Sequence, residues 1–205
     1  RSPFAYLQSI GLLNDKTLAV HAVWASEEDM RLVRENGVGI SVTTESEMKL
    51  ASGVAPIPEF LEAGLVVGLG TDGCASNNNQ DMFQEMDFVA KLHKVNKLDP
   101  TVLDARIVLS LATRGGALAV GLENAVGSIE VGKRADIITI DTAKPHWTPL
   151  YDPSSHLVYV AKGSDVRDVV IDGNVVVENR RIRTMNMGKV IEDMEKWQRR
   201  IASSH

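Results

Sequence analysis

The 205-residue sequence contains one cysteine, Cys74, so an internal disulfide bond is excluded. This usage suits a reducing compartment, and we expect a cytoplasmic protein. No apolar run approaches the roughly 20 residues that a membrane span requires, and the first residues show no signal-peptide pattern. The sequence therefore predicts no membrane partner.

Positive charge is also scarce. Lysine and arginine number 22 against 27 aspartate and glutamate residues, which gives a net charge of −5. Phosphate binding needs clustered lysine and arginine, so we expect no nucleic-acid partner. The short basic stretch 180–183 is interpreted as a solvated turn.

Compact metal-binding motifs are missing as well. The sequence has no HxH pair, no HExxH and no CxxC. A zinc site takes three or four protein ligands, so no complete metal site can be identified from these motifs.

The sequence does contain alternating apolar runs and helical segments. A helix is expected after the N-cap Ser26, with its end at Asn36-Gly37. This alternation predicts an α/β fold with parallel strands and crossover helices. The expected strands are 17–23, 38–44 and 65–72. The later helices are 56–64, 81–97 and 101–121, and the last segment is expected to be one or two helices with a break at Gly115-Gly116.

The pattern changes near residue 126, where short strands and a hairpin turn at Asp172-Gly173-Asn174 are expected. An amphipathic helix over 187–202 closes the chain. The expected divisions are a partial (β/α) barrel over 1–125, a β-sandwich segment over 126–183 and a C-terminal helix segment over 184–205.

Three strand–helix units are too few to close an eight-stranded barrel, which takes about 200 or more residues by itself. The units make a small open sheet, or the missing strands come from elsewhere. Residues 1–11 resemble the tail of a helix, so we expect a fragment or a processed product.

Two polar residues end apolar strands: His21 and Asp72. The ligand site of a parallel α/β fold lies at that end of the sheet, and both side chains are ligands that zinc and iron accept. The alternative is structural, with Asp72 capping a turn and His21 hydrogen-bonded in the core.

Three segments carry a resemblance to a known family: residues 12–38, residues 48–86 with GTDGCASNNN followed by DMFQEM, and residues 126–141 with GSIEVGKRADIITID. Together they resemble the C-terminal half of the amidohydrolase superfamily. The most similar subgroup is the 5-methylthioadenosine/S-adenosylhomocysteine deaminases, beside triazine chlorohydrolases and guanine deaminases.

The resemblance implies the C-terminal part of a metal-dependent (β/α)8 barrel, then part of a β-sandwich and a closing helix. Asp72 corresponds to the metal-binding aspartate of the eighth strand, where it also contacts substrate and transfers a proton. His21 corresponds to the sixth-strand histidine beside the hydrolytic water. The implied cofactor is one divalent metal, zinc or alternatively iron, whose other ligands lie outside this chain.

The seventh strand departs from the family pattern HNPxSNxKLASG. Val42, Thr43 and Thr44 stand where the family has His, Asn and Pro, and Glu47 replaces the second Asn. Because this strand end lines the pocket, altered specificity and reduced activity both remain open.

The expected function of the intact protein is hydrolytic deamination of an adenosine derivative, with a nucleoside-type substrate. One alternative is dechlorination or deamination of a triazine, guanine or pyrimidine ring. Another is a non-catalytic assembly fragment that pairs with itself or with the missing N-terminal half. The chain alone is expected to be inactive.

The remaining polar candidates have simpler interpretations. Asn77, Asn78 and Asn79 are expected to fix a loop, with substrate contact as the alternative. His93 is expected to interact with the helix dipole in a lysine-rich helix end.

Overall fold

The computed structural model describes residues 1–203, which divide into two compact units. The first comprises Arg1–Lys133 and Thr142–Gly163, and the second comprises Arg134–Asp141 and the residues from Ser164 onward. Among the helices of the described residues, none is both long enough and apolar enough to span a membrane.

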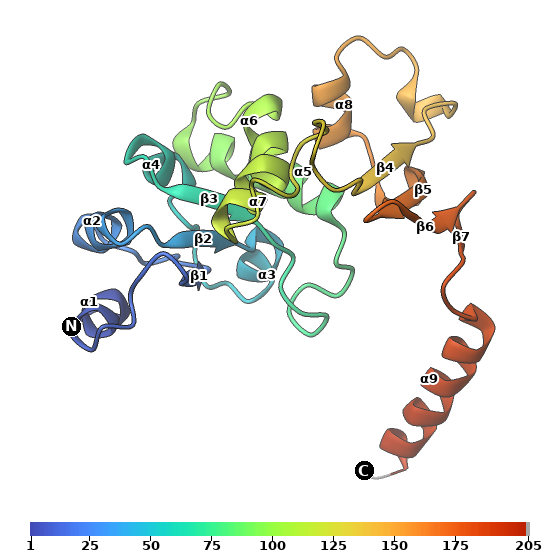
Figure 1. Cartoon of the computed structure of the whole chain (residues 1–205), viewed down its shortest axis with the longest axis horizontal. Helices are drawn as coiled ribbons and strands as arrows, with labels where there is room; N and C mark the ends of the chain where they lie inside the picture. The colour runs from blue at the N-terminus through green and yellow to red at the C-terminus, as the bar shows by residue number, and fades with distance from the viewer. Residues whose placement is uncertain (204–205) are drawn as a thin grey trace. The chain divides into compact units, whose positions relative to one another are not determined.

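Strands and helices alternate through most of the first unit (Figure 1). In chain order its elements are α1 (Pro3–Ser9), β1 (Leu18–Val20), α2 (Glu27–Glu35), β2 (Gly39–Val42), α3 (Thr44–Lys49), α4 (Ile57–Glu62), β3 (Val66–Leu69), α5 (Met82–Lys97), α6 (Ala105–Ser110), the π-helical turn η1 (Leu111–Gly115), α7 (Gly116–Ala119), the 3₁₀ turn η2 (Pro145–Trp147) and α8 (Pro153–Tyr159).

The three strands of this unit form one parallel sheet in the order β1-β2-β3. Gly39 of β2 is in register with Leu18 of β1 and with Val66 of β3. The predicted α/β class is confirmed, although each strand is shorter than its apolar run. Since parallel strands end at the same edge, the residues after β1 and β3 lie near each other.

Helix α2 begins as predicted. The Ser26 side chain accepts a hydrogen bond from the Asp29 amide, and the Asp29 carboxylate accepts one from the Ser26 amide at 3.0 Å. This reciprocal capping box satisfies two amide groups that have no partner within the helix. Gly37, at a φ of 67°, follows the C-cap Asn36 and turns the chain into β2.

The predicted helix over 101–121 begins at Ala105, and the expected break at Gly115-Gly116 is wrong. Both glycines have helical dihedral angles, so η1 continues directly into α7. Close packing requires a glycine at position 115, because a Cβ there would lie 2.4 Å from the Val67 carbonyl oxygen. It also requires a glycine on the strand, because a Cβ on Gly68 would lie 2.7 Å from the Gly116 Cα. The helix backbone therefore rests directly on β3.

The first helix also differs from the prediction. Residues 1–11 do not form the tail of a helix, because α1 starts at Pro3 and its Ser2 N-cap accepts a hydrogen bond from the Ala5 amide at 3.1 Å. Proline at the first helical position fits this start, since its missing N–H needs no partner there.

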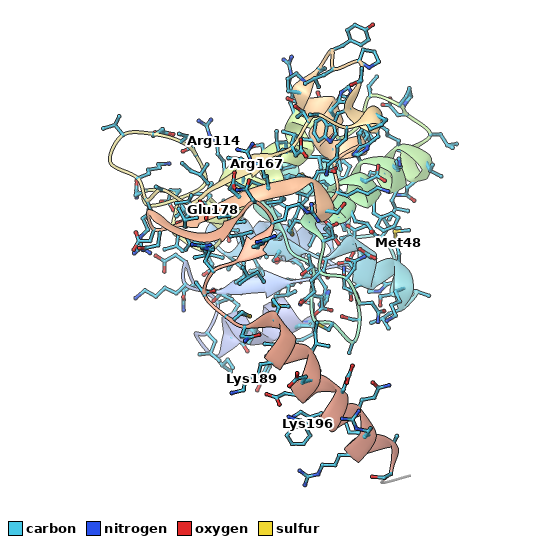
Figure 2. All side chains as sticks on the ribbon, turned by 90° about the vertical axis from the view of Figure 1, so that its right-hand side faces the viewer. Met48, Arg114, Arg167, Glu178, Lys189 and Lys196 are labelled. Carbon is cyan, nitrogen blue, oxygen red and sulfur yellow. The ribbon has the colours of Figure 1, made fainter. Side chains whose placement is uncertain are left out.

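The second unit is an antiparallel sheet in the order β4-β5-β6-β7, followed by one helix. Asp172 and Gly173 form the predicted hairpin turn, both with positive φ, as a two-residue turn between twisted strands requires. Figure 2 shows Lys189 and Lys196 projecting from the final helix. The elements are β4 (Ile137–Ile140), β5 (Val166–Ile171), β6 (Asn174–Glu178), β7 (Arg181–Ile182) and α9 (Met187–Ala202).

The closing helix predicted over 187–202 is observed as α9, and positions 204–205 lie outside the described residues. Three large apolar residues of this helix, Val190, Met194 and Trp197, are exposed in the structure, with 39%, 62% and 54% of their surfaces accessible.

Candidate active site

His21 directly follows β1 and remains attached to the sheet. Its amide donates to the Ser41 carbonyl oxygen at 2.9 Å, and its φ of 72° turns the chain away from the strand direction. The ring Nδ1 lies 2.8 Å from the Thr43 hydroxyl and 3.7 Å from Glu47 Oε1. His21 is thus oriented by two residues that follow the neighbouring strand.

Asp72 lies just beyond β3, also in a left-handed conformation with a φ of 63°. Its Oδ1 accepts from the Gly73 amide at 2.8 Å, and its Oδ2 accepts from the hydroxyls of Ser46 at 2.7 Å and Ser76 at 2.6 Å. These hydrogen bonds, with that from Ser76 foremost, lower the pKa of Asp72 to about 2. The carboxylate is therefore ionised at neutral pH.

Helix α3 connects the two strand-end residues. Its Ser46 hydroxyl holds Asp72, and the next residue, Glu47, lies beside the His21 ring. Glu47 is only 2% exposed, and burial raises its pKa while the Thr43 amide and His21 oppose the rise. The sequence places residues 42–53 at a pocket-lining strand end, but it does not reveal this helix or these two contacts.

The start of α3 is capped from another element. Thr43, its N-cap, makes no side-chain cap hydrogen bond, and the Glu85 carboxylate of α5 accepts from the amides of Thr44 and Glu45 instead. Glu85 is fully buried, and burial raises its pKa to about 8 against the opposing effect of those amides. Sequence reasoning missed Glu85, because its partners lie some 40 positions earlier in the chain.

The asparagines after Asp72 fix their own loop, as predicted. Asn77 Oδ1 accepts from the amides of Asn79 at 3.1 Å and Gln80 at 2.7 Å. The side chains of Asn77 and Asn79 both donate to the Glu45 carboxylate of α3, at 3.1 and 3.0 Å. The loop that follows Asp72 is therefore tied to the same short helix that carries Ser46.

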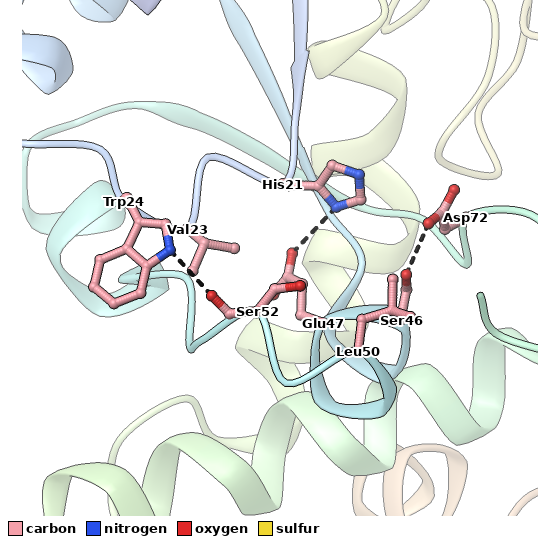
Figure 3. Close-up of a pocket in the computed structure, with 8 residues that line it drawn as sticks. All are labelled: His21, Val23, Trp24, Ser46, Glu47, Leu50, Ser52 and Asp72. Atoms are coloured by element: carbon pink, nitrogen blue, oxygen red, sulfur yellow. Dashed lines mark hydrogen bonds and ion pairs between the residues drawn. The ribbon is translucent and has the colours of Figure 1, made fainter. Parts of the chain in front are cut away.

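His21 and Asp72 line one cavity of about 320 Å³ (Figure 3). Trp24 is at the rim, 84% exposed, and its indole N–H donates to the Ser52 carbonyl oxygen at 3.0 Å. Apolar walls with a few directed polar groups are typical of small-molecule sites. The full lining consists of His21, Val23, Trp24, Ser46, Glu47, Leu50, Ser52 and Asp72.

The residues of this cavity fit a metal ion only in part. An ionised carboxylate has about four acceptor positions, and three hydrogen bonds to Asp72 leave room for one metal bond. Within residues 1–203, however, no group of three or more His, Cys, Asp or Glu side chains could hold a metal. Asp72 fits as one ligand of a site that needs further donors.

The prediction for His93 is wrong. Its side chain is 1% exposed, and its Nδ1 finds no hydrogen-bond partner among the described residues. Burial lowers the pKa of His93 to about 4, so the ring is neutral near pH 7 and does not act as a cation at the end of α5.

Cys74, two positions after Asp72, is exposed with a free thiol.

Comparison with known proteins gives one family and several similar chains. The family model described as "Amidohydrolase family" matches residues 1–176. The chain is 53% identical to a 5-methylthioadenosine/S-adenosylhomocysteine deaminase from Syntrophobacter fumaroxidans, over 94% of this chain and 44% of that protein.

Solved structures agree in fold. An adenosine deaminase from Xanthomonas campestris with bound zinc superposes with a TM-score of 0.95 at 39% identity, over 99% of this chain and 46% of the other. An atrazine chlorohydrolase from Arthrobacter aurescens complexed with zinc gives 0.86 at 29% identity, over 95% and 43%. The chain thus spans under half the length of the proteins it matches.

Proposed function

Because the chain belongs to the amidohydrolase family, we propose that the intact protein deaminates an adenosine derivative of the 5-methylthioadenosine or S-adenosylhomocysteine class. The observation that carries this proposal is the 53% identity to a deaminase of that name over 94% of the chain. The joint position of His21 and Asp72 on one cavity supports it.

The proposed setting is a complete (β/α)8 barrel in a cytoplasmic enzyme. In it, β1, β2 and β3 act as the sixth, seventh and eighth strands, and strands outside these 205 residues supply the remaining metal ligands. Zinc is the proposed metal, with Asp72 as one ligand, and bound zinc in two similar structures supports this choice.

The chemistry of this chain's residues follows from their positions. A divalent metal would lower the pKa of bound water from about 16 towards 7. The ionised Asp72 takes a proton from the attacking water and passes it to the departing amino group, so that water and the amino-purine give the oxo-purine and ammonia. His21 hydrogen-bonds to the attacking water and orients it.

A substrate panel on the intact protein tests the reaction. 5-Methylthioadenosine, S-adenosylhomocysteine and adenosine should release ammonia, with kcat/KM at least about 100-fold above that for guanine or a chlorotriazine. No ammonia from any adenosine derivative, together with turnover of another ring, would overturn the proposal.

The role of Asp72 has its own test. Asp72→Asn should remove both the base and a metal ligand, so kcat/KM should fall about 10³-fold or more and zinc content should drop. Asp193→Asn on α9 is the matched control, because Asp193 is about half-exposed, pairs with Lys196 and does not line the cavity. Asp72→Asn protein with normal zinc content and activity would contradict the assignment.

The second candidate is hydrolysis of a triazine ring. It is favoured by the structural likeness to the atrazine chlorohydrolase. Chloride release from atrazine that is faster than ammonia release from every adenosine derivative would establish it.

A further inference from the structure

A buried carboxylate lies directly behind the ring of His21. Glu47 is 2% exposed, whereas the His21 side chain is 45% exposed and borders the cavity. Glu47 Oε1 lies 3.3 Å from the Thr43 amide, which donates to it, and 3.7 Å from His21 Nδ1. The carboxylate therefore has a fixed position relative to one particular ring nitrogen.

Nδ1 faces two oxygen atoms and no donor nitrogen. The Thr43 hydroxyl oxygen is 2.8 Å away, and the Glu47 carboxylate follows at 3.7 Å. The Thr43 hydroxyl can donate or accept and so fits either tautomer. An unprotonated Nδ1 would direct its lone pair towards the ionised carboxylate, which is repulsive, whereas a protonated Nδ1 is attracted to Glu47. In a neutral imidazole only one nitrogen carries a proton, so Nε2 is then free to accept.

We propose that Glu47 is a positioning residue that keeps the proton of His21 on Nδ1 and leaves Nε2 to accept from the reacting water. This rests on the proposed function for its catalytic consequence, but the proton position itself does not. In this proposal Glu47 acts through His21.

The carboxylate is suited to this task by its chemistry. Once ionised, it can only accept hydrogen bonds, so it favours a donor at Nδ1. A carboxamide in the same place can rotate to present either an acceptor or a donor, so it leaves the tautomer unspecified. The asparagine expected at this position from the family pattern therefore does not provide the same control.

Nitrogen-15 spectroscopy of selectively labelled histidine in the intact protein measures the proton position. The wild-type protein should show His21 as the Nδ1-protonated tautomer. In Glu47→Gln, an isosteric change, the signals should move towards a mixture of tautomers. The kcat on the adenosine derivative should fall about 10- to 100-fold, with KM changed less than 3-fold.

Two further variants keep the test decisive if Glu47→Gln folds poorly. Glu47→Asn introduces the residue of the family pattern and removes the carboxylate, so it should shift the tautomer in the same direction. Glu62→Gln on α4 removes an exposed carboxylate and should change neither signal nor rate.

The outcomes separate the two proposals. An unchanged tautomer in both Glu47→Gln and Glu47→Asn would overturn the positioning role even in an active deaminase. The predicted tautomer and its loss in the variants, in a protein without deaminase activity, would support the positioning role and refute the proposed function.

Discussion

Glu85 is a carboxylate whose burial disfavours its ionised form. It is fully buried on α5, yet two amides at the start of α3 donate to it. Burial has the larger effect and raises the pKa of Glu85 from 4.5 to about 8. The same side chain caps the helix that carries Ser46 and Glu47, so its protonation bears on the stability of the site.

The raised pKa predicts a pH-dependent stability. The folded state binds the Glu85 proton more tightly than the unfolded state, so this contribution is full below about pH 4.5 and is lost as pH rises through about 8. Each unit of pKa difference corresponds to about 1.36 kcal/mol, and relaxation of the buried site reduces the total. The free energy of unfolding should therefore fall by about 2 to 4 kcal/mol as the pH rises from about 4.5 to above 8.

Urea unfolding of the intact protein at pH 5, 7 and 9 measures this effect. Glu85→Gln keeps an acceptor for the Thr44 amide and does not titrate, so the difference in stability between wild type and variant should change with pH. Parallel curves for the two proteins would show that Glu85 has an ordinary pKa.

At the scale of single residues, the sequence identified the polar residues at the strand ends but not the side chains that hold them in place. His21 and Asp72 could be selected because each follows an apolar run, which is a local pattern. Glu47 could be noted only as a departure from the family pattern. Ser46 and Glu85 could not be selected, since their importance depends on contacts between β3, α3 and α5 that no periodicity encodes.

At the scale of elements, the adjacent glycines Gly115 and Gly116 differ in the space that each leaves for a side chain. Both are helical, but a Cβ on Gly115 would meet the Val67 carbonyl oxygen at 2.4 Å, whereas a Cβ on Gly116 would meet the Leu111 carbonyl oxygen at an ordinary 3.6 Å. Only the first position therefore limits the approach of the helix to β3.

This contrast gives a matched pair of variants. Gly115→Ala should lower the free energy of unfolding by about 2 kcal/mol or more, because the helix has to move off the strand. Gly116→Ala should be neutral or stabilising by up to about 1 kcal/mol, because alanine favours a helix interior. Thermal unfolding of the intact protein compares them, and equal melting temperatures would contradict the packing argument.

The mistaken helix break has the same physical origin. A glycine pair within a helical pattern predicts a helix end, since glycine costs about 1 kcal/mol there relative to alanine. Tertiary packing against β3 overrides that preference. The start of α2, by contrast, was predictable because its capping box is entirely local.

At the scale of the whole molecule, the number of metal donors limits what these 205 residues do alone. The described residues contain no group of three His, Cys, Asp or Glu side chains that could hold a metal. Asp72 is one proposed ligand, and a zinc site needs three or four.

The isolated 205-residue chain should therefore bind zinc weakly, with a Kd above about 10 μM, and should not release ammonia from an adenosine derivative. Calorimetric titration measures the affinity, and the intact protein serves as the positive control. Stoichiometric sub-micromolar binding by the chain alone would contradict the assignment of the missing ligands to other residues.

The order of strands and helices could be predicted from the sequence because apolar residues repeat at different intervals in strands and in helices. The sequence also predicted that three strand–helix units leave a sheet open, and the observed sheet has three strands. The division into units was not accessible: Thr142–Gly163 belongs with the first unit although it follows β4 in the chain.

Helix α3 has a consequence for how this region can change during evolution. Adjacent residues of a helix point about 100° apart, and this angle directs Ser46 towards Asp72 and Glu47 towards His21. Deleting or inserting one residue between Val42 and Ser46 would rotate both side chains together and disconnect both strand ends. We therefore expect homologous sequences to vary in residue type here while keeping the length of this segment constant.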